Sequence, residues 1–449
     1  MLPLRSPVFS SAPRRRGVPV EARAAIALRP ATFAVIAAFC LRAALLVASH
    51  YAEDRHTIAL QVVGREAQLI ASSLASGKGF ANAFAGYEMP TAWLAPVYPA
   101  FLSLGFRLYP INVTDGGLYF GQFLNAAFSA FTCWPVCWLG GRLAGARIGL
   151  AAAWAWVVMP FAILFPLEWV WDQSLSALVL AVLLCVTYQV REAAEESAAW
   201  AGYGCLWGLA ALANPTLCVL LPFLLAWIAV GRVRAGAAVR APVGKVMLLF
   251  LLCLAPWTAR NYFTLDGFVF VKSNFGLELW LGNNMQVPAD DVFAPRLHPM
   301  ENFHELLPLV FQGEPNYSRA KERQAVEFIR THPGTFLELV ARRIGDTWTA
   351  DFDSRHDPWV TVLHAGRAEV WFDTLLSVAA LAGLVLALAR NADEAMPLAL
   401  AVVAFPIPYY ITHTTLRYRH PIDPVLTILA VYAIAAALGR RTGSAATAR

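Results

Sequence analysis

The chain has 449 residues, of which 58% are hydrophobic and only 14% are charged, and its mean hydropathy is +0.53. Soluble domains carry roughly 45–50% apolar and about 25% charged residues, so this composition excludes a water-soluble enzyme, a disordered chain, a small disulfide scaffold and a nucleic-acid-binding domain. The formal net charge of +5 resides mainly on arginines in short segments between apolar runs, a pattern typical of membrane orientation signals.

A helix that crosses a membrane needs about 20 predominantly apolar residues, and ten runs of the chain are predicted to be such spans. Their approximate limits are 31–49, 117–139, 148–167, 171–190, 198–213, 215–231, 245–258, 369–389, 394–412 and 421–439. The fold class predicted from them is an all-α polytopic membrane protein.

A further apolar run, 93–110, is broken by Pro96 and Pro99. Counting it as a span would invert every later segment and would move the arginines of the short loops to the outside. Because basic residues in short loops stay cytoplasmic, this run is predicted to be an interfacial or re-entrant helix.

The resulting topology is one membrane domain with polar insertions on one face. The predicted parts are a cytoplasmic basic tail at 1–30, a membrane domain at 31–258 with an external loop at 50–116, an external helical insertion at 259–368, transmembrane helices at 369–439 and a cytoplasmic tail at 440–449. The first run is interpreted as an uncleaved span rather than a signal peptide, because its basic leader is long and Arg42 interrupts its apolar core. An arginine inside a span is by default a functional candidate, but a structural pairing of Arg42 is equally open.

The first external loop contains a candidate carboxylate, Glu66. Residues 63–75 have helical spacing, with Ala67, Ile70 and Ala71 on one side. Glu66 lies near the start of this helix, where a carboxylate is stabilised by the helix dipole. A structural first-turn acid and a catalytic carboxylate are therefore both open.

A second carboxylate, Asp172, lies where the third span ends and the fourth begins, on the same external face. Gln173 and Ser174 follow it, so Asp172 is predicted to be the N-cap of the fourth span. A catalytic role for this boundary residue is the alternative.

Four basic residues mark the external ends of later spans. Arg260 and Lys272 follow the seventh span, and Arg417 and Arg419 precede the tenth. The guanidinium fork suits a phosphate group. That phosphate could belong to a substrate or to a lipid headgroup that anchors the protein.

The second external region contains a polar helical stretch. Residues 317–329 are amphipathic, with Ala320, Val326 and Ile329 predicted to share the apolar side. Further along, Arg342 and Arg343 are expected to face solvent rather than to bind phosphate.

No metal or disulfide site is predicted. His298 and His304 are only loosely spaced, and all seven cysteines lie in apolar runs, whereas structural zinc and disulfide sites place their ligands at closer or regular spacings in polar segments.

Several motifs in chain order carry a resemblance to a known family. After the first span and an acidic residue come A-x-SLA-x-G-x-GF, PTAW-x-AP-x-YP, PW-x-x-RNY, GLELWLGNN and RYRHPI-x-P. Over about residues 30–440 this order resembles the bacterial branch of the dolichyl-phosphate-mannose–protein mannosyltransferase superfamily, that is, glycosyltransferase family 39-like enzymes of the GT-C fold.

The resemblance implies a GT-C-type bundle of about ten transmembrane helices with periplasmic loop insertions, in the bacterial inner membrane, with both termini cytoplasmic. It implies inverting transfer of a sugar from a polyprenyl-phosphate donor to a glycan, lipid or protein acceptor at the periplasmic face. The expected partners also include membrane lipids but no nucleic acid. No cofactor is required by this reaction, although a divalent metal could take part.

The resemblance also assigns roles to residues. Glu66 is the expected general base or acceptor-positioning acid, although the Asp-Glu pair of many members reads Arg65-Glu66 here. Asp172 falls on the family's second acidic position. The residues expected to bind the donor phosphate are Arg260, Arg417, Arg419 and Lys272.

Two other function classes fit parts of the pattern. A transporter or flippase of lipid-linked saccharide would also use charged external loops and a basic mouth, but the repeat symmetry and broken midplane helices usual in transporters are not evident. A scaffold or polymer-export subunit would not need acidic residues at two external membrane boundaries.

Overall fold

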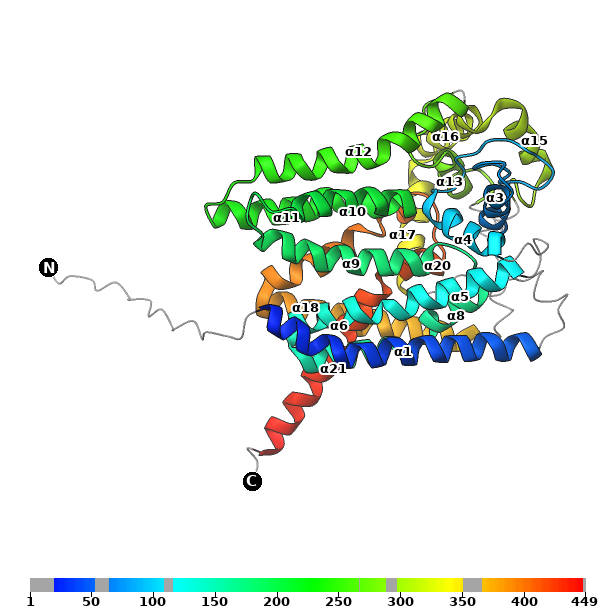
Figure 1. Cartoon of the computed structure of the whole chain (residues 1–449). Helices are drawn as coiled ribbons and strands as arrows, with labels where there is room; N and C mark the ends of the chain where they lie inside the picture. The colour runs from blue at the N-terminus through cyan, green and yellow to red at the C-terminus, as the bar shows by residue number, and fades with distance from the viewer. Residues whose placement is uncertain are drawn as a thin grey trace.

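The computed structural model describes residues 20–52, 64–108, 116–265, 267–287, 297–349 and 366–446, with no side-chain description at the ends of some helices. Apart from one isolated bridge between Ala81 and Pro90, the described residues that have regular structure are helical (Figure 1). The predicted all-α class is confirmed. Residues 1–19 of the predicted basic tail lie outside the described residues.

Long helices form the bundle. They are α1 (Val20–Ala52), α5 (Gly116–Phe131), α6 (Cys133–Ala144), α7 (Ala146–Val157), α8 (Pro160–Glu168), α9 (Gln173–Glu192), α10 (Ala199–Ala213), α11 (Leu220–Arg234), α12 (Arg240–Thr264), α18 (Gly366–Ala404) and α21 (Asp423–Ala446). Shorter elements connect or cap them. They are α3 (Arg65–Ala75), α4 (Val97–Leu108), η1 (Pro215–Val219), α13 (Phe275–Gly282), α15 (Phe303–Gln312), α16 (Glu314–Thr331), α17 (Pro333–Thr349), α19 (Ile407–Ile411), α20 (Leu416–Arg419) and η3 (His420–Ile422).

Eight segments of the described chain are long and apolar enough to cross a membrane. One of them, Val370–Ile411, has 42 residues and contains a non-helical break at Asn391, so it covers two predicted spans. The predicted span 198–213 corresponds to α10, whose 15 residues make it shorter than the usual span. The chain is therefore a multi-pass membrane protein.

The ambiguous run 93–110 forms a short helix, α4. It has 12 residues, which corresponds to a length of about 18 Å, whereas a bilayer core is about 30 Å thick. The described helix alone is shorter than the bilayer core, and the interfacial or re-entrant placement of this run stays a prediction.

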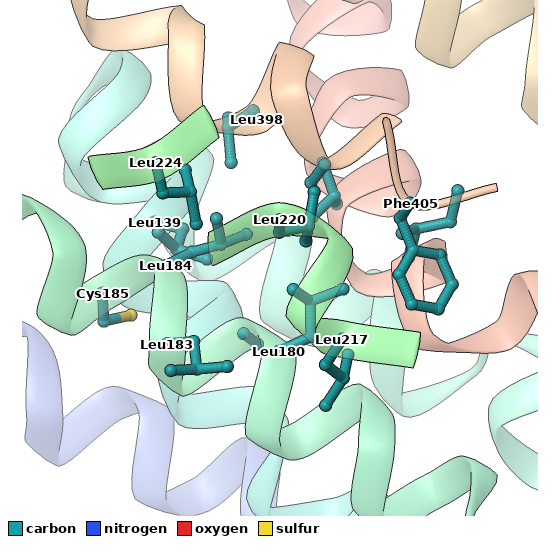
Figure 2. Packing of buried hydrophobic residues seen from close by; sticks show 14 of the residues in the cluster. Leu139, Leu180, Leu183, Leu184, Cys185, Leu217, Leu220, Leu224, Leu398 and Phe405 are labelled. Atoms are coloured by element: carbon teal, nitrogen blue, oxygen red, sulfur yellow. The ribbon is translucent and has the colours of Figure 1, made fainter. Parts of the chain in front are cut away.

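Leucines fill the centre of the bundle. Figure 2 shows Leu139 of α6, Leu180 and Leu184 of α9, and Leu220 and Leu224 of α11 in one buried cluster. Large apolar side chains elsewhere point outward, including Phe33, which is 69% exposed. An apolar exterior of this kind is what a helix bundle presents to lipid.

Arg42 forms hydrogen bonds that have a structural role. It is fully buried, and its guanidinium donates to the backbone oxygens of Trp156 (3.1 Å) and Ala162 (2.7 Å). Pro160 and Pro166 lack the N–H groups that would bond these two oxygens within the helix. Arg42 thus replaces donors that the two prolines remove, which answers the open question about its pairing.

The short helices α3, α4, α13, α15 and α16 gather at one end of the bundle (Figure 1). The carboxylate of Glu314 fastens the two insertions together, because it accepts bonds from the hydroxyl of Thr91, from the backbone N–H of Ala92 (2.9 Å) and from the hydroxyl of Ser273 (2.6 Å). Burial raises the pKa of Glu314, and these hydrogen bonds and Arg260 oppose that shift.

Two predictions about the second insertion were wrong. The buried face of α16 contains Tyr317, Lys321 and Ala325, rather than the predicted apolar side. Lys321 occupies this face because its ammonium lies 3.4 Å from the ring centre of Trp280 and 2.6 Å from a carboxylate oxygen of Glu305.

The second wrong prediction was that Arg343 faces solvent. Its side chain is buried rather than solvent-facing, and it donates to the backbone oxygens of Tyr410 (3.2 Å) and Ile411 (3.1 Å). These oxygens lie at the end of α19, where helical carbonyls have no helical partner. Its neighbour Arg342 is exposed as predicted.

Candidate functional site

Glu66 is positioned by a glycine before α3. Gly64 has φ 116°, and a Cβ there would lie 2.0 Å from the backbone oxygen of Val170, so only glycine fits this approach. The close contact brings the first turn of α3 against the segment between α8 and α9. Glu66 lies in that turn, 6% exposed, with Ala67, Ile70 and Ala71 buried beside it as predicted.

Asp172 lies directly before α9, in the N-cap position that the sequence predicted. Its carboxylate, however, makes no capping bond, and among the described residues the hydroxyl of Ser176 lies 3.5 Å from it. Burial raises the pKa of Asp172, whereas the positive charges of Lys272 and Arg417 oppose the shift. The carboxylate is therefore available for another role.

A small cavity separates these elements. It is lined by Ala67 of α3, Tyr98 of α4, Trp171, Asp172 and Lys272, among others, and has a volume of about 20 Å³. That is room for about one water molecule. A sugar could occupy this position only after the surrounding helices move apart.

Arg417 of α20 lies in an aromatic enclosure. Its guanidinium carbon is 5.2 Å from the ring centres of both Trp169 and Trp171 and 4.9 Å from that of Tyr418. Its Nη2 donates to the hydroxyl of Tyr418 (3.2 Å), but its buried Nε has no hydrogen-bond partner among the described residues. An unsatisfied buried donor is costly, so this N–H is poised for an acceptor.

Three further ionisable residues complete the cluster, and sequence reasoning did not select them. Glu278 of α13 bonds His413 at 2.7 Å between Oε2 and Nε2, and His298 lies beside Glu66. Burial alone would raise the pKa of Glu278, but the bond and the charge of His413, with Lys272, lower it to about 2. A single acid within the otherwise apolar stretch of α13 was the signal that could have identified Glu278.

The structure thus brings together four of the six predicted site residues. Glu66, Asp172, Lys272 and Arg417 interact electrostatically at the end of the bundle where the insertions lie. We refer to these four residues with Glu278, His298 and His413 as the charged cluster.

Arg260 and Arg419 have other partners. Arg260 donates to the backbone oxygens of Thr91 (2.6 Å) and Phe80 (2.7 Å). Arg419 is buried between helices, where it pairs with Asp373 (2.5 Å) and Asp423 (3.1 Å).

Within the described ranges, no group of three or more His, Cys, Asp or Glu side chains could hold a metal ion. The described residues therefore do not fit a metal site of the usual kind.

Comparison with known proteins gives information about the fold alone. No family model and no curated protein matches the chain. Among solved structures, the oligosaccharyltransferase of Archaeoglobus fulgidus in its apo form is 15% identical with a TM-score of 0.52, over 94% of this chain and 52% of that one. The same enzyme tethered to an acceptor peptide with the NVT sequon is 14% identical with a TM-score of 0.53, over 92% and 50%.

The chain therefore spans about half the length of that oligosaccharyltransferase. ArnT from Cupriavidus metallidurans bound to undecaprenyl phosphate also matches, with 13% identity and a TM-score of 0.36 over 87% of this chain and 77% of that one. The GT-C-type helical membrane fold that the resemblance implied is confirmed by the similarity to the oligosaccharyltransferase.

Proposed function

We propose that the chain is an integral membrane glycosyltransferase that moves a sugar from a polyprenyl-phosphate donor to a glycan, lipid or protein acceptor. The observation that carries this proposal is the charged cluster, in which buried carboxylates interact electrostatically with an arginine that has an unsatisfied N–H. A transferase with a lipid-phosphate leaving group needs both kinds of group in one partly dry site.

In the proposed reaction, the oxygen of the acceptor hydroxyl attacks the anomeric carbon of the donor sugar, and Glu66 accepts the proton of that hydroxyl. The bond between that carbon and the phosphate oxygen breaks at the same time, with inversion, and polyprenyl phosphate leaves. Asp172, whose pKa burial raises, is the alternative base.

Arg417 and Lys272 are the proposed ligands of the donor phosphate. The free Nε of Arg417 can donate to a phosphate oxygen in a charge-assisted bond, and its aromatic neighbours exclude water from that bond. Arg260 and Arg419 are proposed to have a structural role, in which they hold the elements around the site in place. Their donors already bond Thr91 and Asp373, respectively.

We also propose the sidedness implied by the resemblance. The charged cluster would face the periplasm, both termini would be cytoplasmic, and the protein would lie in a bacterial inner membrane. The two cations make a cofactor unnecessary in this mechanism, and a divalent metal would be an addition to it, testable by chelation.

The test measures release of polyprenyl phosphate by purified protein in lipid. The probes are undecaprenyl-phosphate mannose, glucose, galacturonic acid and aminoarabinose, each with envelope lipid or glycan fractions as acceptor. Glu66→Gln is expected to reduce turnover by about 10²- to 10⁴-fold, and Arg417→Gln by about 10²- to 10³-fold. Glu88→Gln, in an exposed pair with Lys78, is the matched control and should retain wild-type turnover.

Other outcomes would reject parts of the proposal. Full turnover by Glu66→Gln together with loss in Asp172→Asn would move the base to Asp172. Transbilayer movement of the lipid-linked sugars without any release of polyprenyl phosphate would favour the flippase alternative.

A further inference from the structure

His298 extends from the second insertion to the proposed base in the first. Its Nε2 lies 4.0 Å from Oε1 of Glu66, and both side chains are largely buried. The imidazole packs edge-on against the buried ring of Trp93, with ring centres 5.9 Å apart. This contact fixes the plane of the ring that faces the carboxylate.

The second ring nitrogen determines the tautomer. Nδ1 of His298 accepts a hydrogen bond from the backbone N–H of Met300 at 3.2 Å. A ring nitrogen that accepts a bond carries no proton, so the neutral imidazole has its proton on Nε2. The atom that faces Glu66 is therefore the donor.

The surroundings favour this neutral form. Burial lowers the pKa of His298 below its ordinary value of 6.5. The charges that face it come from four elements: Glu66 of α3 and Glu278 of α13 oppose the shift, and Arg417 of α20 and His413, in the segment before it, add to it. Protonation would also cost the bond from Met300, because both ring nitrogens of an imidazolium are donors.

We propose that His298 is a positioning residue for Glu66, whose Nε2–H holds one carboxylate oxygen and leaves the other for the acceptor hydroxyl. The inference rests on the proposed function, because it assumes that Glu66 is the general base. The 4.0 Å separation is longer than a hydrogen bond, and the pair closes when substrate binds, since catalytic hydrogen bonds are often long in a free enzyme. His298 itself exchanges no proton with the substrate.

The kinetic test compares His298→Ala, His298→Gln and the control His304→Gln, an exposed histidine of α15. With whichever undecaprenyl-phosphate sugar turns over, His298→Ala should lower kcat on the order of 10- to 100-fold and leave KM for the donor unchanged. The acidic limb of its pH profile should move to higher pH, because the carboxylate loses a donor that stabilises its charged form. His298→Gln, which keeps an N–H donor, should restore most of kcat and should return the acidic limb of the pH profile close to its wild-type position.

A second measurement requires no substrate. Nitrogen-15 spectra of histidine-labelled protein, wild type against His298→Gln, should assign one neutral imidazole with protonated Nε2 and unprotonated Nδ1. The opposite tautomer, or an unshifted acidic limb in His298→Ala, would overturn the positioning role. Full turnover by Glu66→Gln would instead reject the base itself, so the two failures are distinguishable.

Discussion

Glu278 illustrates how a partner reverses the effect of burial on one carboxyl group. Its bond to His413 (2.7 Å) lowers its pKa from the ordinary 4.5 to about 2, although burial acts in the opposite direction. A group with a depressed pKa in the folded protein stabilises the fold fully above its unfolded value, and that contribution is lost as the pH falls through the folded value.

Removing this carboxylate should therefore have a pH-dependent effect on stability. We expect Glu278→Gln to lower the Tm at pH 6, and the difference from wild type should shrink as the pH falls from about 4.5 towards 2. Thermal unfolding in detergent at stepped pH measures it. Glu88→Gln is the control, because an exposed pair contributes little at any pH; a Tm difference that stays constant down to about pH 3 would contradict this account.

Arg42 allows a second residue-scale prediction. Arg42→Met should destabilise the protein by about 1–3 kcal/mol through the loss of its buried hydrogen bonds, although the hydroxyl of Ser129 and the backbone N–H of Met159 still donate to the oxygens of Ala162 and Trp156. Adding Pro166→Ala should recover part of that loss, because the new alanine would supply the missing N–H to the backbone oxygen of Ala162. A double-mutant cycle in Tm measures the coupling. Strictly additive effects would show that Arg42 does not compensate for the proline.

These residues mark what could be inferred from the sequence and what could not. The sequence identified Arg42 as unusual, but three of its partners are backbone oxygens more than 100 positions away, and the sequence pattern contains no signal for such contacts. The buried face of α16 was misassigned for a related reason. Lys321 counts as polar in any pattern, yet its ammonium lies over the ring of Trp280 and its side chain is buried.

At the scale of elements, apolar run length predicted the spans well, because the membrane imposes a minimum helix length. α10 is an exception that packing explains. It is shorter than a usual span, and three of its aromatic side chains, Trp200, Tyr203 and Trp207, are fully buried. Neighbouring helices rather than lipid surround much of this helix.

The approach of α10 to α12 depends on glycine, as in other small-residue helix contacts in membranes. A Cβ at Gly208 would lie 2.4 Å from Cβ of Cys253, whereas a Cβ at Gly202 would meet nothing within 4 Å. Gly208→Ala should therefore lower the Tm through overpacking worth about 1–3 kcal/mol. Gly202→Ala is the matched control on the same helix and should leave the Tm unchanged or raise it slightly, since alanine favours helix by about 1 kcal/mol; equal effects at both positions would refute the packing argument.

At the scale of the whole molecule, the polar insertions meet at one end of the bundle (Figure 1). The positions of the basic residues in the short loops predicted that the insertions share a face, because they determine how many spans separate the two insertions. It could not distinguish Arg417, with an unpartnered Nε, from Arg419, which pairs with Asp373 and Asp423. The two arginines are two positions apart in α20, so they point to different sides of the helix.

The same arrangement predicts the accessibility of three engineered cysteines in right-side-out vesicles. Lys78→Cys lies after α3, Arg323→Cys on the exposed side of α16, and Ala235→Cys at the far end of α11. A membrane-impermeant maleimide should label the first two from outside and Ala235→Cys only after permeabilisation. If α4 crossed the membrane, an odd number of crossings would separate Lys78 from the insertion that carries Arg323. Lys78→Cys and Arg323→Cys would then label from opposite sides, and the proposed common face of the charged cluster would be lost. The parent protein without these substitutions is the control, because its native cysteines lie within apolar helices, where such a reagent has little access.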